Sequence, residues 1–278
     1  MYRRILAAVN EYTNSEIAAR YAIAIAKACE AKLCLAFVAD RRAGADELRK
    51  AESALERLFL EATASGLEAE SVVTEGDPLR RLKEKVKEHG IDLSFISTRH
   101  EDVGKRFFTR TRARALLVNL PSSVAMVRVV HMKHIHPSHI LVPLRGRTSS
   151  FEERAYFTAK MAEAFGASVT LFHSTLPITR FFHGEIRLSA AQREKGLPED
   201  IERFSEYLGR QGVDYEKRAE YGGVSRSITT EAALRRNDLI IMGGSERGAL
   251  RSVFSGDPAE VVLRETPCNL IILRPAAG

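Results

Sequence analysis

Short apolar runs alternate with longer amphipathic stretches along the whole chain. Runs such as residues 5–9 and 140–144 are brief and bounded by polar residues, which is typical of buried strands. In the longer stretches, such as residues 15–31 and 151–167, apolar residues recur at helical spacing. Strands that alternate with helices of this length predict a mainly parallel sheet with helices on both faces.

This pattern occurs twice. Residues 2–10 and 137–145 are similar apolar strands, and each is followed by a polar loop, a helix and a second strand. A third strand, a helix and a fourth strand follow in residues 69–97 and in residues 214–244. The repeat indicates a duplicated domain, which the length of 278 residues accommodates.

Both halves close alike, with a proline that ends a helix before a fifth apolar strand. These prolines are Pro121 and Pro267. The sequence therefore predicts two tandem α/β domains, residues 1–131 and 132–278, each a mainly five-stranded parallel sheet flanked by helices. Because an exposed apolar strand edge invites aggregation, we expect the two domains to associate through their last strands as a pseudo-dimer.

The composition is that of a globular protein, with 45% hydrophobic and 28% charged residues. The apolar stretches are shorter than the roughly 18 residues of a membrane span, and the first ten residues lack a signal-peptide core, so we expect a cytoplasmic protein with no membrane partner. Cys29, Cys34 and Cys268 form neither a metal-ligand pattern nor a disulfide framework, and we expect all three to be small buried hydrophobic residues.

The net charge of +6 is unevenly distributed, because no acidic residue lies between Asp102 and Glu152. This basic span could attract phosphates or an acidic partner, or it could be a solvated surface balanced elsewhere in the fold. Without an aromatic platform interleaved with its basic residues, the span is weak evidence for single-strand binding, so nucleic acid is not the favoured partner.

Two further segments have alternative interpretations. Four histidines near the domain boundary could bind a metal or form a polar hinge; without an accompanying cysteine or acidic pair, no metal site is predicted. They are His131, His134, His136 and His139. The inserted residues 174–198 contain an apolar cluster around Phe181 and Phe182, which could be a lid or partner patch but is expected to pack locally.

Residues 239–274 resemble the closing segment of universal stress protein domains. That segment has a strand, then Gly-x2-Gly-x9-Gly-Ser/Thr, a helix and a Pro-Cys-Pro-like turn, and the turn at residues 75–78 and the Ile-Leu pairs of both first strands also match. The resemblance covers both halves. The resemblance implies an adenine nucleotide alpha hydrolase-like fold and a role in the stress response. In the family, an acidic residue at the end of the first strand lies near the adenosine of the bound nucleotide. The resemblance also implies that the whole chain can dimerise. A glycine loop before a helix N-terminus suits phosphate, because backbone N–H groups can approach the oxygens closely.

The second half keeps part of this glycine loop. Gly243 and Gly256 match the first and last glycines of the motif, whereas Glu246 replaces the middle glycine. Asp257 stands where the motif has Ser or Thr, and Arg145 stands where the family has an acid at the end of the first strand. Carboxylates near phosphates oppose binding unless a cation such as Mg²⁺ compensates, so ATP or AMP binding here is expected to be weak. The candidate nucleotide-binding residues are Gly243, Gly244, Ser245, Gly248, Ser255, Gly256 and Arg145.

The first half has lost these glycines. Ser97 and His100 occupy the first two glycine positions. Arg110 and Thr111 occupy the Gly-Ser/Thr position, and Asn10 stands where the family has an acid at the end of the first strand. Side chains now fill the space of the backbone approach, so we do not expect ATP to bind there in the manner of the family. Arg110 and Thr111 remain a candidate anion site.

No catalytic motif is present: there is no Gly-x-Ser-x-Gly elbow, Walker loop or pyrophosphatase loop. We expect a non-catalytic stress-response regulator with degenerate nucleotide sites and an unidentified protein partner. The alternative is an ATP- or AMP-binding protein that uses the second-domain loop, with weak ATPase activity.

Overall fold

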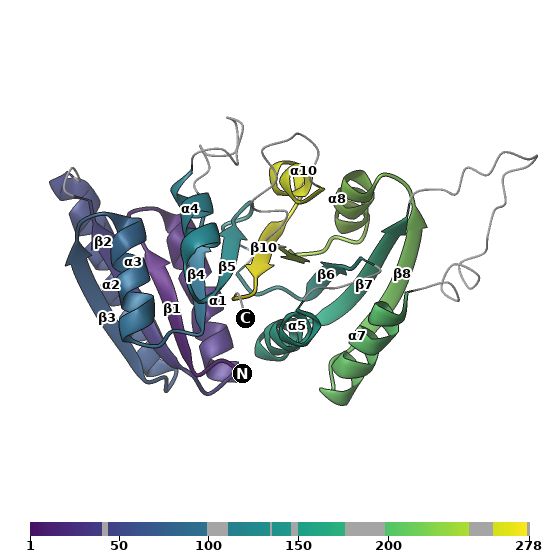
Figure 1. The fold of residues 1–278 in the computed structure, drawn as a ribbon, viewed down its shortest axis with the longest axis horizontal. Helices are drawn as coiled ribbons and strands as arrows, with labels where there is room; N and C mark the ends of the chain where they lie inside the picture. The colour runs from purple at the N-terminus through teal and green to yellow at the C-terminus, as the bar shows by residue number, and fades with distance from the viewer. Residues whose placement is uncertain are drawn as a thin grey trace, which may run out of the picture.

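The computed structural model describes residues 1–40, 44–98, 111–133, 135–145, 150–175, 198–244 and 258–276. Both halves show the predicted alternation of strands and helices (Figure 1). The first half comprises β1 (Arg4–Val9), α1 (Thr13–Ala28), β2 (Lys32–Ala39), α2 (Ala45–Ala64), β3 (Ala69–Glu75), α3 (Pro78–Glu88), β4 (Leu93–Ser97), α4 (Arg112–Asn119) and β5 (Ser123–Arg128). The second comprises β6 (His139–Pro143), α5 (Phe151–Phe165), β7 (Ser168–Thr175), α7 (Glu199–Arg210), β8 (Tyr215–Tyr221), α8 (Val224–Leu234), β9 (Leu239–Gly243), α10 (Pro258–Glu265) and β10 (Asn269–Arg274).

The strands of both halves form one ten-stranded sheet, in the order β3-β2-β1-β4-β5-β10-β9-β6-β7-β8. All neighbouring strands are parallel except β5 and β10, which pair antiparallel at the centre with Met126 opposite Ile272. The predicted α/β class and its five-stranded parallel halves are therefore confirmed. The last strand of each half is covered by that of the other half.

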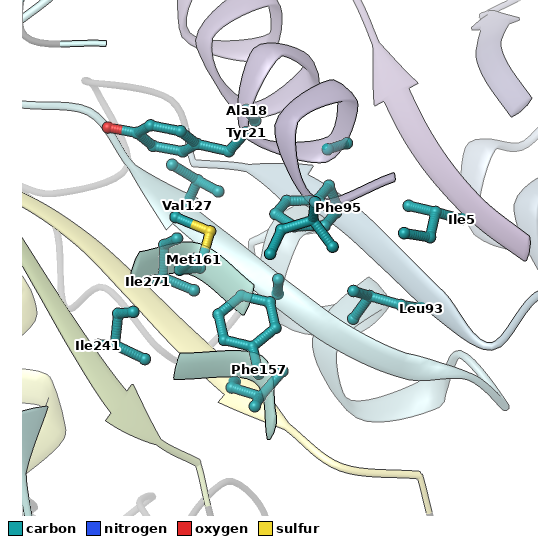
Figure 2. Packing of buried hydrophobic residues seen from close by; sticks show 14 of the residues in the cluster. Ile5, Ala18, Tyr21, Leu93, Phe95, Val127, Phe157, Met161, Ile241 and Ile271 are labelled. Atoms are coloured by element: carbon teal, nitrogen blue, oxygen red, sulfur yellow. The ribbon is translucent and has the colours of Figure 1, made fainter. Parts of the chain in front are cut away.

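Helices cover the two faces of this sheet and form two cores. Helices α1, α2, α5 and α7 pack over one face, and α3, α4, α8 and α10 pack over the other. The first core continues across the domain boundary, where Phe95 of β4 lies 6.2 Å from Phe157 of α5, measured between ring centroids (Figure 2). Val127 and Ile271 of the two central strands belong to the same core.

Local sequence explains the turn that begins α3. Gly76 has a φ of 135°, which favours glycine, and Asp77 caps the helix by accepting a 2.8 Å hydrogen bond from the N–H of Arg80. Pro78 occupies the first helical position, where its missing N–H costs nothing. The turn thus directs α3 back along the sheet beside the carboxyl ends of β1 and β2.

One cysteine differs from expectation. Cys34 and Cys268 are buried, but Cys29 is only partly buried, because it lies at the C-terminal end of α1. There its sulfur accepts a 3.4 Å hydrogen bond from the hydroxyl of Tyr156.

The described histidines near the domain boundary contact different groups. A ring nitrogen of His131 lies 2.8 Å from the carbonyl oxygen of Pro267, the ring of His136 packs edge-on against Phe165, and His139 lies 3.8 Å from Asp238. His134 and most of the insertion, residues 176–197, lie outside the described residues. Among the helices that the structure describes, none combines the length and the apolar character that a membrane span requires.

Candidate functional site

A cleft lies in the first domain at the carboxyl ends of β1, β2 and β4. It has a volume of about 260 Å³ and is bordered by the N-terminal halves of α3 and α4. This is the point where the strand order reverses around β1, the usual ligand crevice of an open α/β sheet. Its apolar walls are Ala8, Val9, Ala36, Phe37, Val38, Pro78, Leu82, Ile96, Ala113 and Leu116.

Polar groups ring this first-domain cleft. Asp40 follows β2 directly, and its Oδ2 lies 2.7 Å from Nη2 of Arg112, the first residue of α4. The side chain of Arg112 is 60% exposed, so this ion pair contributes at most about 1 kcal/mol to stability. The pair spans two elements of the lining, and a competing anion could displace Asp40 from Arg112 at little cost. The other polar lining residues are Asn10, Glu11, Tyr12, Glu47 and Ser97.

Helix α4 points its N-terminal end at the cleft. Thr111 caps it by accepting a 3.2 Å hydrogen bond from the N–H of Arg114, and a hydroxyl that accepts a bond can also donate one. The first N–H groups of a helix carry a partial positive charge that favours an anion. Of the two candidate anion-site residues, Thr111 thus caps α4 beside the cleft without lining it, and Arg110 lies outside the described residues.

Asn10, at the position of the family's acid, organises the loop after β1. Its Oδ1 accepts a 2.9 Å hydrogen bond from the N–H of Tyr12, and its own N–H donates to Oγ of Ser15. This Asx-type turn is a local conformation that Asn adopts readily. It places Asn10 on the rim of the cleft with an amide in place of a carboxylate.

The second domain differs at the corresponding place. A β-carbon on Gly243 would lie 2.6 Å from Cζ of Arg154, so the guanidinium occupies the space beside the glycine. Arg154 donates one long hydrogen bond, 3.5 Å, to the carbonyl oxygen of Pro143. Burial, with a smaller effect of nearby Arg145, lowers the pKa of Arg154 to about 10.

The adjacent Gly244 serves packing against the sheet. Its N–H donates a 2.7 Å hydrogen bond to Leu273, and a β-carbon there would lie 3.0 Å from Ile272. Arg145 is exposed. The remaining candidates of the second-domain loop lie outside the described residues: Ser245, Gly248, Ser255 and Gly256.

Sequence reasoning missed Asp40, Glu47 and Arg112 as site residues. Asp40 carries a usable signal, because a polar residue that directly follows a parallel strand lies at the ligand edge of the sheet. Glu47 carries no such sequence signal, because it belongs to α2 and only the path of the chain brings it to the cleft.

Comparison with known proteins agrees with the geometry. The model of the universal stress protein family matches this chain twice, over residues 1–128 and 137–274. The chain belongs to the universal stress protein family. This tandem universal stress protein is 28% identical over 128 residues to a universal stress protein of Thermus aquaticus, an alignment that covers 45% of this chain and 92% of that one.

Two solved structures share the whole two-domain arrangement. One is a universal stress protein from Archaeoglobus fulgidus, with a TM-score of 0.67, 17% identity and coverage of 98% of this chain and 96% of that chain. The other, from Pseudomonas aeruginosa and described as belonging to the same family, has a TM-score of 0.67 and 18% identity and covers 99% of this chain and 94% of its own. At these identities the likeness establishes the fold of the tandem universal stress protein.

Proposed function

We propose that this tandem universal stress protein is a regulatory protein that binds an adenine nucleotide in the first-domain cleft without turning it over. The observation that carries the proposal is the cleft itself, with apolar walls, a helix N-terminus and an arginine, Arg112, whose partner Asp40 a competing anion can displace. Its volume is just below the roughly 300–1,000 Å³ of typical ligand pockets, which suits a nucleoside with its phosphate at the mouth. This is not the half that the glycine pattern favours.

The charge of the lining favours a nucleotide with few phosphates. Among the described residues of the lining, Glu11, Asp40 and Glu47 contribute three carboxylates and Arg112 contributes one guanidinium. Like charges at close range oppose binding, so each added phosphate is unfavourable unless a cation screens it. AMP is therefore the favoured ligand, and ATP requires Mg²⁺ to approach its affinity.

Matched substitutions in the two halves test this site. Ser97 and Gly243 hold the same position of the repeat, at the ends of β4 and β9. Ser97→Val narrows the first-domain cleft, and Gly243→Val is the control in the second domain. Titration calorimetry measures the affinity for AMP, and for ATP with and without magnesium. Ser97→Val should weaken binding at least tenfold, whereas Gly243→Val should change the affinity by less than about twofold. No phosphate should be released on long incubation with ATP.

If Gly243→Val weakens binding and Ser97→Val does not, the result favours the second candidate function, which is ATP or AMP binding at the glycine loop of the second domain. Retained Gly243 and Gly256 are the observation behind it. In that case Glu246→Gly combined with Asp257→Ser should strengthen ATP binding, because two carboxylates are removed from the loop. If neither half binds a nucleotide, a scaffold role with a protein partner is the remaining function.

A further inference from the structure

Arg274, at the end of β10 in the second domain, reaches into the first domain. It is 3% exposed, and its guanidinium donates hydrogen bonds to the carbonyl oxygens of Leu117, Leu120 and Ser122. The bonds to Leu120 and Ser122 are each 2.7 Å long. These acceptors are the last turn of α4 and the link from α4 to β5.

This contact holds one end of a helix whose other end borders the cleft. The last carbonyls of a helix have no partner within it and carry a partial negative charge, so a buried guanidinium is a strong cap. Helix α4 has only eight residues, or about 12 Å, between this cap and Arg112. Arg112, Ala113 and Leu116 of the same helix line the cleft.

The equivalent arginine of the first domain makes no such contact. In the antiparallel pairing Arg274 lies opposite Val124, and Arg128 lies opposite Leu270, so the two arginines are related by the pseudo-two-fold axis. Within the described residues, Nε of Arg128 is buried without a hydrogen-bond partner. Burial correspondingly lowers the pKa of Arg128.

A single residue of the repeat accounts for part of this asymmetry. Thr266 stands where the first domain has Leu120, and its hydroxyl donates a 2.8 Å hydrogen bond to the carbonyl oxygen of Cys268. That carbonyl corresponds to the carbonyl of Ser122, which Arg274 binds in the first domain. The second domain thus satisfies this carbonyl locally, whereas the first domain depends on its neighbour.

We infer that Arg274 is a positioning residue through which the second domain sets the place of α4 and thereby the affinity of the first-domain cleft. This inference rests on the proposed function for the ligand but not for the position of α4. Without Arg274 three buried carbonyl oxygens lose their partner, and α4 gains freedom to shift toward the cleft. The second domain then acts as a built-in effector of the first.

The test compares Arg274→Met with the matched control Arg128→Met, and adds Arg274→Lys as the conservative variant. Hydrogen exchange of the free proteins should show faster exchange of the α4 amides in Arg274→Met, with partial protection in Arg274→Lys and none of this change in Arg128→Met. AMP affinity should fall about tenfold in Arg274→Met and less than twofold in Arg128→Met, within the roughly 5–150-fold range of coupled sites.

The outcomes separate this inference from the proposed function. Equal exchange of α4 in the wild type and Arg274→Met overturns the positioning role, whether or not AMP binds. Faster exchange of the α4 amides in Arg274→Met with unchanged AMP affinity overturns the coupling to the cleft. Equal losses of AMP affinity in Arg274→Met and Arg128→Met overturn it as well. A wild type that does not bind AMP overturns the proposed function, and the exchange comparison then decides the positioning role alone. Should Arg274→Met fail to fold, Arg274→Lys carries both measurements.

Discussion

At the scale of single residues, Asn269 joins the two domains. It is fully buried; its Oδ1 accepts hydrogen bonds from the N–H groups of Val130 and His131, and its Nδ2 donates to the hydroxyl of Tyr21 at 3.0 Å. Asn269→Leu should lower the free energy of unfolding by about 2 kcal/mol, because two part-buried N–H groups lose their acceptor and the buried hydroxyl of Tyr21 loses its donor. Urea denaturation measures it.

The control for Asn269 is its counterpart in the repeat. Ser123 accepts a single 2.9 Å hydrogen bond, from the N–H of Ala276 near the end of the chain. Ser123→Ala should cost about 1 kcal/mol. This bond also joins the two domains, so a loss in Asn269→Leu no larger than that in Ser123→Ala would mean that the additional hydrogen bonds of Asn269 add nothing to the junction.

Two buried thiols and one buried phenol, which can lose a proton at high pH, predict that the protein loses stability in alkali. Burial raises the pKa of Cys34, of Cys268 and of Tyr21, in each case to about 12. In the unfolded chain the thiols lose protons near pH 9 and the phenol near pH 10, while the folded state keeps them. Stability should therefore be unaffected below about pH 8 and fall as the pH rises toward 12.

Thermal melts between pH 7 and 11 measure this fall. The variant with Cys34→Ala and Cys268→Ala should lose less of its stability between pH 9 and 11 than the wild type. The same pH dependence in both proteins would assign the effect to other groups. At pH 8 the native thiols of Cys34 and Cys268 should react with a disulfide reagent only after unfolding, since the thiolate is the reactive form.

At the scale of elements, the ion pair between Asp40, just after β2, and Arg112 of α4 lines the cleft. Asp40→Asn removes one carboxylate and releases Arg112 from it, so AMP should bind several-fold more tightly, whereas Arg112→Gln should bind it more weakly. Titration calorimetry distinguishes these opposite signs. Arg20→Gln, which breaks a 3.0 Å ion pair with Glu61 between α1 and α2, is the control and should leave the affinity unchanged. A change of the same sign in Asp40→Asn and Arg112→Gln would argue against anion recognition by Arg112.

At the scale of the whole molecule, β5 and β10 form the centre of one continuous sheet. Residues 1–131 expressed alone would expose the apolar edge of β5, which should either pair with a second copy or aggregate. Sedimentation velocity should therefore find a dimer or larger species of this half, and its urea midpoint should lie below that of the full chain. A stable monomeric half would show that the pairing is dispensable.

Association of the whole chain is a separate prediction. With β5 and β10 paired, the outer strands β3 and β8 are the remaining edges of the sheet. Light scattering at micromolar concentrations tests the homodimer that the family resemblance implies, and a monomer throughout that range would contradict it.

The sequence alone determined the fold, because its physical signals are local. Apolar period and length separate strands from helices, the Gly76-Asp77-Pro78 turn specifies the start of α3, and the repeat divides the chain in two. The position of Thr111 at the start of α4 followed from the family's Gly-Ser/Thr motif.

Only the tertiary structure decided which side chains share a site. Glu47 and Arg112 are 65 positions apart, and the path of the chain alone brings them to one cleft. The guanidinium of Arg154 fills the space beside Gly243, a neighbour that the glycine motif does not record. Arg128 and Arg274 are equivalent in the repeat, but only Arg274 meets open carbonyls, because Thr266 satisfies one of their counterparts. Such differences depend on contacts between distant segments, and no local pattern records them.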